Sequence, residues 1–192
     1  MSELKDQAYP VGRVPAIEVR HAEEADMEAV QSIYAHHVLK GFATFEEVPP
    51  SVHEMAQRRL AVMAAGIPYL VAVRGDEVVG YAYATAYRAR PAYRYTIEDS
   101  VYVRDGLGGQ GIGSALLGEM IKLCEQGPWR QMLAIIGDSG NNGSIALHAR
   151  MRFEHVGVLR AVGYKHGRWV DTVLMQRSLG DGDGSHPPGS RA

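Results

Sequence analysis

Hydrophobic residues recur along this chain at helical spacing in some stretches and at strand spacing in others, and these changes of period divide it into elements. A helix is predicted over Glu23–Leu39, where the apolar residues at helical spacing are Met27, Val30, Ile33, Tyr34 and Val38. Gly41 should end this helix. A second helix is expected to begin at Ser51, because Ser51-Val52-His53-Glu54 has the pattern of a capping box, and to end near Gly66.

Alternating or continuous β-rich runs predict strands in seven places. The predicted strands are Ala16–Arg20, Tyr69–Arg74, Val78–Tyr87, Arg94–Val103, Gln131–Gly137, Val156–Val162 and Arg168–Gln176. Turns are expected at Gly75-Asp76-Glu77 and at Lys165-His166-Gly167, so the strands that flank each turn should form hairpins.

Two further helices complete the pattern. One follows a glycine-rich loop and ends at Gln126-Gly127-Pro128, and the other runs from a cap at Asn141 or Asn142 to about Arg152. The resulting order is β-α-α-β-β-β-α-β-α-β-β, with one parallel crossover around the glycine loop. It predicts an α/β (α+β) fold with a mixed, mostly antiparallel central sheet and helices on both faces.

The ends of the chain differ in composition from its centre. Residues 1–15 are polar and contain two prolines, which predicts a flexible N-terminus. Residues 179–192 read as a disordered tail, since the final GDGDGSHPPGSRA has no hydrophobic content. Residues 16–178 are therefore expected to form a single domain.

Composition narrows the class of protein. The chain has 192 residues, a hydrophobic content of 46% and a net charge of −2, which gives no reason to expect a nucleic-acid partner. Cys124 is the only cysteine, so the chain cannot form an internal disulfide, and no His or Cys spacing predicts a metal site. No apolar run is long enough for a signal-peptide core or a membrane span, so we expect a cytoplasmic protein with no membrane partner.

The segment Ile97–Cys124 says most about function. It reads as an extended strand, then a glycine-dense turn, then an amphipathic helix. In such an arrangement the backbone N–H groups of the turn converge on an anion, and the helix dipole adds partial positive charge at the same place. The segment therefore predicts a binding site for a phosphate-bearing ligand.

Two common phosphate-binding motifs are excluded, one by the order of the elements and the other by the residues of the loop. Gly106-Leu107-Gly108-Gly109-Gln110-Gly111 matches GxGxxG, but a dinucleotide-binding domain carries this motif in its first βα turn and then repeats βα units. Here about a hundred residues of helices and hairpins precede the loop. A P-loop is excluded because no GK[ST] ends the glycine run.

The segment resembles instead the Gcn5-related N-acetyltransferase superfamily, in which a strand, the motif [RQ]-x-x-G-x-[GA] and a helix hold acetyl-CoA. The strand here is Ser100–Val103 and the motif window is 108–113, where Gly108 replaces the Arg or Gln of the first position. One side-chain contact is therefore expected to be lost, while the backbone donors remain.

Further segments in the same order are similar to the phosphinothricin and methionine sulfone/sulfoximine N-acetyltransferase family, over roughly residues 17–178. They are Arg88-Ala89-Arg90-Pro91-Ala92-Tyr93, Thr96-Ile97-Glu98-Asp99-Ser100-Val101-Tyr102-Val103, Ile135-Ile136-Gly137, Asn141-x-x-Ser144-x-x-Leu147-His148 and Leu159-Arg160-x-x-Gly163-Tyr164-Lys165-His166-Gly167-x-Trp169-x-Asp171. One more departure is Met151-Arg152-Phe153, where relatives usually carry Leu-Gly-Phe.

The resemblance implies an acetyl-CoA site in the centre of the chain. The residues it assigns to this site are Val101, Tyr102, Val103, Gly108, Gly109, Gln110, Gly111, Ile112, Gly113, Ser114, Asn141 and Ser144. The backbone N–H of Val103 or a neighbour would stabilise the oxyanion, if the strand diverges from its neighbour there. Asn141 could instead serve only as a helix cap.

Glu98 is the candidate general base, because it precedes the coenzyme-binding segment on the same strand and corresponds to the family's catalytic glutamate. Partial burial would raise its pKa and suit this role. The alternative is a solvated carboxylate paired with Arg94. Asp99 projects to the opposite face and is the weaker candidate. His148 could protonate or stabilise the leaving thiolate, or could be an ordinary hydrogen-bonded helix histidine.

The substrate side is less specific. Arg88 and Arg90 could hold a carboxylate, or could lie in a solvated basic loop. Phe45 and Tyr93 could line an apolar slot or belong to the core, and Lys165 and His166 could close a hairpin over the site or be solvated turn residues. Cys124 is expected in the core beside Leu116 and Met120, not as a nucleophile, and His36-His37 are expected to be helix surface and core residues.

These observations predict an acetyl-CoA-dependent N-acetyltransferase that acts on the α-amine of a small amino-acid-like molecule by direct transfer in a ternary complex, since no acyl-enzyme nucleophile is evident. The family suggests phosphinothricin, methionine sulfoximine or methionine sulfone as substrates, and a homodimer. The alternatives are an acetyltransferase for a polyamine, a lysine or a protein N-terminus, and a non-catalytic acyl-CoA sensor. A resistance enzyme and a housekeeping enzyme are not distinguished by this sequence.

Overall fold

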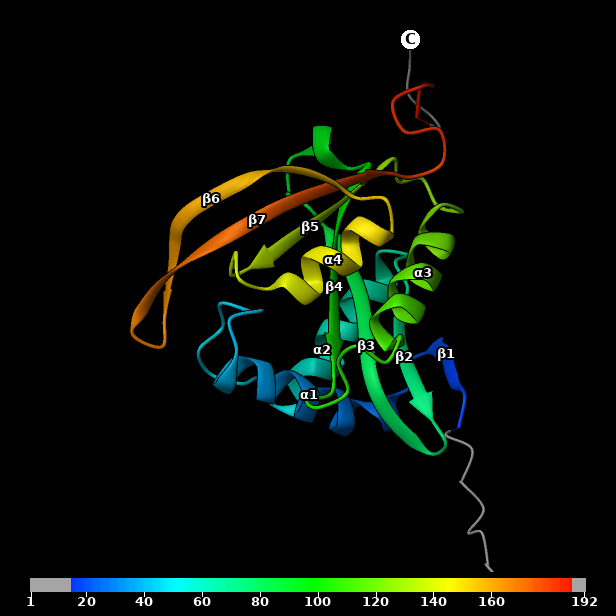
Figure 1. Ribbon diagram of the computed structural model, residues 1–192. Coiled ribbons are helices and arrows are strands. Elements are labelled where there is room, and N and C mark those ends of the chain that lie inside the picture. The colour runs from blue at the N-terminus through cyan, green and yellow to red at the C-terminus, as the bar shows by residue number, and fades with distance from the viewer. Residues whose placement is uncertain (1–14, 188–192) are drawn as a thin grey trace, which may run out of the picture.

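A single mixed sheet runs through the computed structural model, which describes residues 15–187 (Figure 1). Its strands are β1 (Ile17–His21), β2 (Tyr69–Arg74), β3 (Glu77–Ala86), β4 (Thr96–Val103), β5 (Gln131–Gly137), β6 (Glu154–Lys165) and β7 (Arg168–Ser178). They lie in the order β1-β2-β3-β4-β5-β7-β6, and β4–β5 is the parallel pair among antiparallel ones. The predicted mixed, mostly antiparallel sheet with one crossover is confirmed.

Four α-helices cover the two faces of the sheet: α1 (Met27–Lys40), α2 (Val52–Ala64), α3 (Ile112–Cys124) and α4 (Asn142–Arg150). On β3, small residues alternate with tyrosines, so the two faces of this strand differ. A Cβ on Gly80 would lie 3.1 Å from the Leu116 side chain of α3, which shows that α3 packs on the face with the small residues. Tyr81 stacks on Tyr69 and Tyr102 on the opposite face, and Tyr102 in turn packs edge-on against Tyr34 of α1.

The helix starts show how local hydrogen bonds moved the predicted boundaries. Residues 24–26 form a 3₁₀ turn before α1, in which the Asp26 carboxylate accepts from the Glu23 amide at 2.7 Å and from Arg20. Ser51 caps α2 as predicted, because its Oγ accepts from the Glu54 amide at 3.2 Å. The Glu54 carboxylate, however, binds Arg58 at 2.7 Å, so the reciprocal half of the predicted capping box does not form.

The strand ends differ from the prediction by one or two residues in β1, β3 and β7, and the differences at β4 and β6 have a visible cause or are larger. β4 begins at Thr96 instead of Arg94, because Pro91–Tyr93 form a 3₁₀ turn that the Arg94 amide closes on the Pro91 carbonyl. β6 is longer than predicted and contains an irregularity between Leu159 and Gly163. Its hairpin turns as predicted at His166 and Gly167, both at positive φ, as a tight two-residue turn requires.

The described part of the tail contacts the domain. Leu179 is completely buried, and Arg130 donates to the Ser185 hydroxyl and to the His186 carbonyl. Residues 179–187 therefore pack against the end of the sheet where β5 begins and β7 ends, instead of lying free as expected. The expectation for the N-terminus falls almost entirely on residues 1–14, which lie outside the described residues, as do residues 188–192.

Candidate active site

The sheet forks between β4 and β5. The two strands pair from Thr96–Gln131 to Asp99–Ala134, and the pairing stops there although both strands continue to Val103 and Gly137. Two diverging parallel strands leave main-chain groups unpaired, and such groups must bind something else. The fork was expected from the resemblance as a splayed strand, and the structure places it in the middle of β4.

The direction of each amide in the fork follows from the β3–β4 ladder. Arg104 donates its amide to the Val79 carbonyl at 2.9 Å. Along an antiparallel ladder, residues bonded to the neighbour alternate with residues whose N–H and C=O point away from it. The amides of Val101 and Val103 therefore point away from β3 and into the fork, where β5 does not reach them.

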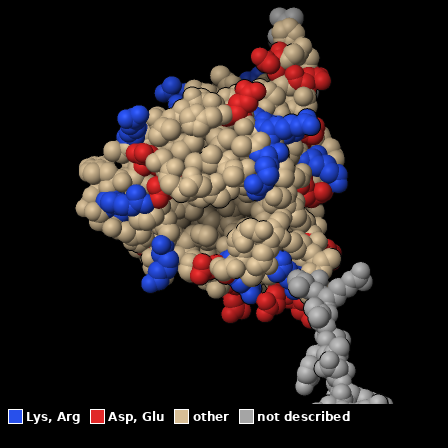
Figure 2. Space-filling model, viewed as in Figure 1, with Lys and Arg blue, Asp and Glu red and all other residues tan. Residues whose placement is uncertain are grey.

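A cavity of about 680 Å³ fills the fork. Figure 2 shows this hollow on one face of the molecule, with uncharged residues around it and charged side chains farther out. Of the residues predicted to bind the coenzyme, those that line it are Val101, Tyr102, Val103, Gly108, Gly109, Gly111, Ile112, Gly113, Ser114, Asn141 and Ser144. Gln110 is not among them, because its side chain lies outside the cavity and hydrogen-bonds to Arg74 of β2 at 2.8 Å.

The glycine loop gives one end of the cavity its donors. Gly106, Gly109 and Gly111 all have positive φ, a conformation that side-chain-bearing residues rarely adopt. Gly111 is the N-cap of α3 at φ 85° and has no side chain to cap the helix, so the first amides of α3 have no capping partner. The loop and the helix start therefore offer converging N–H groups to an anion.

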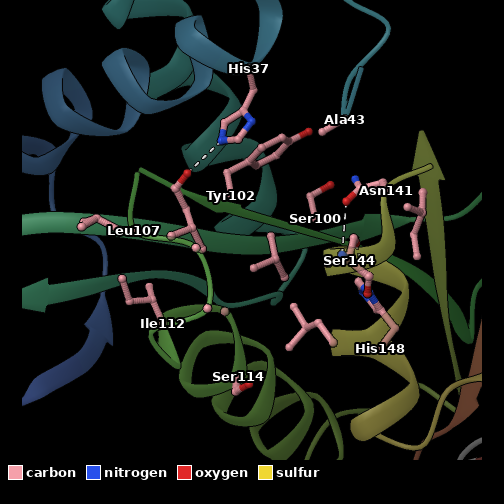
Figure 3. Close-up of a pocket in the computed structure, with 18 of the residues that line it drawn as sticks. His37, Ala43, Ser100, Tyr102, Leu107, Ile112, Ser114, Asn141, Ser144 and His148 are labelled. Atoms are coloured by element: carbon pink, nitrogen blue, oxygen red, sulfur yellow. Dashed lines mark hydrogen bonds between the residues drawn. The ribbon is translucent and has the colours of Figure 1, made fainter. Parts of the chain in front are cut away.

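A histidine of α1 fixes the last carbonyl of β4. His37 Nε2 lies 2.9 Å from the Val103 carbonyl, which can only accept, so Nε2 donates (Figure 3). Burial lowers the pKa of His37 despite this hydrogen bond, which favours the neutral ring. His37 was expected to be a surface or core residue, and neither its spacing nor its neighbours in the sequence indicated that it lines the cavity.

On the other side of the cavity, α4 carries Asn141, Ser144 and His148 (Figure 3). Asn141 caps the helix, since its Oδ1 accepts from the Ser144 amide at 3.2 Å. His148 is only 3% exposed, and its Nε2 lies 3.1 Å from Asp99 Oδ2. The hydrogen-bonded helix histidine is thus the arrangement present, although both His148 and Asp99 line the cavity.

Glu98 lies on the other face of β4 from Asp99, as strand alternation predicted. It does not line the cavity itself, but its strand neighbours Asp99 and Ser100 do. Burial raises the pKa of Glu98, and the negative charge of Asp99 raises it further. A carboxyl with a raised pKa at the end of a coenzyme-sized cavity suits general base catalysis.

The residues predicted from the hairpin form a strap with the loop that follows α1. We use this name for residues 42–46 and 163–168. Lys165 is 2% exposed and donates from Nζ to the Thr44 carbonyl at 2.8 Å, so it is not a solvated turn residue. His166 packs edge-on against Phe42 with ring centroids 5.4 Å apart. A Cβ on Gly163 would overlap the Phe45 ring, so glycine is needed for this close approach.

The basic residues predicted to hold a carboxylate lie in the β3–β4 loop. Arg88 and Arg90 are exposed, and the Arg88 guanidinium lies 4.9 Å from the ring centroid of Tyr87 and 5.6 Å from that of Tyr93. This loop adjoins the Glu98 end of β4, since Tyr87 donates its amide to the Thr96 carbonyl. Among residues 15–187, no hydrogen bond, ion pair or ring contact joins Arg88 or Arg90 to the strap.

Three further expectations concern the cysteine, metal binding and membrane spans. Cys124 is completely buried with its Sγ 3.7 Å from Met120 Sδ, and burial raises its pKa to about 12, so its thiol is neutral and enclosed. Within the described residues there is no cluster of three or more His, Cys, Asp or Glu that could hold a metal ion. No helix in that part of the chain is long and apolar enough to cross a membrane.

Comparison with known proteins places this geometry in a family. A model of the acetyltransferase (GNAT) domain matches residues 19–174. The chain is 55% identical over 172 residues to phosphinothricin N-acetyltransferase from Alcaligenes faecalis, covering 90% of this chain and 87% of the relative. It is 38% identical to the L-methionine sulfoximine/L-methionine sulfone acetyltransferase of Pseudomonas paraeruginosa, covering 84% and 94%.

A solved structure has the same fold. The crystal structure of a GNAT superfamily phosphinothricin acetyltransferase from Sinorhizobium meliloti in complex with AcCoA superimposes with a TM-score of 0.87. The two sequences are 45% identical, and the match covers 91% of this chain and 94% of the other.

Proposed function

Because this chain belongs to the GNAT family of acetyltransferases, we propose that it transfers the acetyl group of acetyl-CoA to the α-amine of a small amino-acid-like substrate. Phosphinothricin, methionine sulfoximine and methionine sulfone are the substrate candidates, since relatives of 55% and 38% identity are named for them. The fork between β4 and β5 is the observation that carries this proposal. The fork lies beside the start of α3, whose uncapped amides can bind an anion, and it opens along β4, which carries the half-buried carboxyl of Glu98.

The residues present fit acetyl-CoA. The amides at the start of α3 would hold the diphosphate, and Val101 or Val103, together with Asn141 and Ser144, would bind the pantetheine arm along the fork. Gly108 supplies no side-chain contact, so these backbone donors carry most of the binding. When bound, the coenzyme supplies the acetyl group in the reactive form of a thioester.

Each step of the proposed reaction is assigned to particular residues of this chain. Glu98 removes a proton from the substrate ammonium, directly or through a water molecule. One of the two amides in the fork, that of Val103 or of Val101, stabilises the oxyanion, while the other binds the pantetheine arm. The oxyanion-binding amide is worth about 3 kcal/mol of transition-state stabilisation. Arg88 and Arg90 attract the substrate carboxylate to the Glu98 end of β4, and Phe45, Tyr93, Lys165 and His166 shape the acceptor side. Transfer is direct, within a ternary complex.

An amine panel tests the proposed function. The purified protein is given acetyl-CoA and one amine at a time, and released thiol is measured with a chromogenic disulfide. We expect thiol release with phosphinothricin, methionine sulfoximine or methionine sulfone, and little with polyamines, lysine or peptide N-termini. Preference for one of the latter amines would replace the substrate class. Tight acetyl-CoA binding without acetylation of any amine would favour an acyl-CoA sensor instead.

We also propose that two copies associate through β6 and β7. Several large apolar side chains of this hairpin are exposed, among them Val156, Leu159, Val162, Tyr164 and Trp169, which is 65% exposed. Contiguous apolar surface of this kind is typical of interfaces. Analytical ultracentrifugation should give a dimer for the wild type and a monomer for Trp169→Asp, and a monomeric wild type would refute this proposal. A cytoplasmic location and a role in resistance stay predictions from the sequence.

A further inference from the structure

Hydrogen bonds link three residues of β4 and α4 that line the cavity. Asp99 Oδ2 lies 3.1 Å from His148 Nε2, and the other ring nitrogen, Nδ1, lies 2.7 Å from the Ser144 carbonyl and 3.4 Å from the Ser144 hydroxyl. Figure 3 shows Ser144 beside His148 at the wall of the pocket. The side chains of Asp99 and His148 are 1% and 4% exposed, whereas Ser144 is half-buried.

The hydrogen-bond partners define the protonation state of His148. The Ser144 carbonyl can only accept, so Nδ1 must carry a proton. Nε2 faces a carboxylate oxygen and therefore also donates. With a proton on each nitrogen the ring is an imidazolium, and Asp99 is its buried counter-ion. The edge of Phe153 packs against the ring with centroids 5.0 Å apart and holds it in place.

The surrounding charges support the same state. Burial alone would lower the pKa of His148, but the hydrogen bond and the charge of Asp99 outweigh burial and raise it. Cys124 is the ionisable group that α3 brings near Asp99, and it is neutral because its pKa is about 12. Asp99 Oδ1 has no hydrogen-bond partner within residues 15–187, so His148 is the partner of this carboxylate there. His148 therefore carries an extra proton at the wall of the cavity.

We propose that Ser144 delivers the proton that the leaving thiolate needs, with His148 as the source of that proton and Asp99 as the residue that positions and charges His148. This rests on the proposed function. Both N–H groups of His148 are engaged inside the protein, whereas the Ser144 hydroxyl lies at the cavity wall within reach of Nδ1. The hydroxyl is therefore the group that can contact sulfur.

The step balances in atoms and charge. When the tetrahedral intermediate collapses, the C–S bond breaks and its electron pair stays on sulfur. Sulfur takes the hydroxyl proton of Ser144, and Ser144 takes the Nδ1 proton of His148. His148 becomes neutral and Asp99 keeps its charge. The substrate ammonium loses two protons on the way to the amide: Glu98 passes the first to solvent before the amine attacks, and it holds the second after the intermediate collapses, to be released to solvent. Solvent protons restore His148 before the next turnover. Asp99 is a positioning residue, since it does not touch the reacting atoms.

The first experiment changes the hydroxyl and the leaving group together. Ser144→Ala should lower kcat with acetyl-CoA about 10²-fold, the usual effect of losing an acid catalyst, and Ser144→Thr should restore most of it. A selenol is a much stronger acid than a thiol and leaves without a proton. With the selenoester analogue of acetyl-CoA, Ser144→Ala should therefore equal the wild type. A defect of the same size with both donors would mean that Ser144 only binds the coenzyme, and would overturn the proposal.

The second experiment uses the pH profile, which a purely structural role would not move. Activity that needs protonated His148 is lost as pH rises through the pKa of His148, and Asp99→Asn should lower that pKa. The alkaline limb of kcat should then move to lower pH, in step with the imidazole titration of His148 followed by NMR. The acid limb should move down too, because Asp99 also raises the pKa of Glu98. An unmoved alkaline limb would overturn the proposal.

Asp26→Asn is the matched control. Asp26 is a buried carboxylate that binds Arg20 at 2.7 Å, and neither residue lines the cavity, so the variant loses a comparable ion pair and should keep the wild-type pH profile. Failure of the proposed function looks different from failure of this inference. In the first case the wild type acetylates no amine, and in the second it acetylates its substrate while Ser144→Ala matches it with both donors.

Discussion

Glu98→Gln lowers kcat about 10²- to 10⁴-fold, the range expected when a general base is removed. The amide of glutamine has nearly the same shape as the carboxyl but cannot accept the proton of the substrate ammonium. Glu98 lies outside the lining of the cavity, so the Kd for acetyl-CoA should stay at the wild-type value. Steady-state kinetics and calorimetric titration measure the two quantities separately.

The pH profile gives this prediction a second readout. A base must be ionised, so activity is lost as pH falls through its pKa, which burial places above the ordinary value for Glu98. The acid limb of kcat/KM assigned to Glu98 should disappear in Glu98→Gln, while the pKa of the substrate amine is the same for both enzymes. Glu18→Gln, on strand β1, is the control and should change neither quantity. A turnover within twofold of the wild type would remove Glu98 from the mechanism.

Gly111→Ala weakens acetyl-CoA binding about 5- to 30-fold. Gly111 caps α3 at φ 85°, and an alanine in the left-handed region costs roughly 1–2 kcal/mol. If the backbone relaxes to avoid this strain, the amides at the start of α3 no longer converge on the diphosphate. Calorimetry should show the loss in Kd, and kcat at saturating acetyl-CoA should fall much less.

The same helix offers a matched control for this substitution. Gly118 lies in the interior of α3, where a Cβ would meet nothing within 4 Å and φ is not positive. Gly118→Ala should raise the free energy of unfolding by about 0.5–1 kcal/mol and leave the Kd for acetyl-CoA unchanged. Equal Kd values for the two variants would show that the conformation of Gly111 does not determine binding.

Local sequence patterns predicted most of the fold because the elements are strongly periodic. The strands Tyr69–Arg74 and Gln131–Gly137 have the predicted bounds, and Ser51 and Asn141 act as caps. The start of α1 moved because the Asp26 side chain binds Arg20 and the Glu23 amide, contacts for which the apolar spacing of the helix carries no signal. Leu179 was assigned to a disordered tail because its burial depends on the rest of the sheet.

The site was predictable where it is built from the backbone and less so where it depends on side chains from several elements. The glycine loop and the end of β4 could be recognised because their function requires particular backbone conformations. Asp99 was correctly placed on the face opposite Glu98, but only the packing of α4 shows that His148 meets it there. His37 reaches Val103 across 66 positions of sequence, and no local pattern encodes such a contact.

One departure from the family has a visible backbone consequence. The family resemblance leads us to expect glycine where this chain has Arg152, and Arg152 adopts φ 63°, in the left-handed region. An arginine in this conformation is strained relative to glycine. Nothing in the structure explains the substitution, because no hydrogen bond or ion pair of the Arg152 side chain is found in the described chain.

Mutations are expected to affect the two sides of the fork differently. In the proposed reaction the coenzyme arm depends mainly on main-chain groups of β4 and of the glycine loop, which substitutions outside the positive-φ glycines alter little. The strap, beside the end of β5, presents side chains from segments about 120 positions apart, as the Lys165–Thr44 contact shows. Acceptor preference can therefore diverge in a lineage while the acetyl donor stays constant. Over evolutionary time, such a division would produce relatives that share acetyl transfer but are named for different acceptors, as two relatives of this chain are.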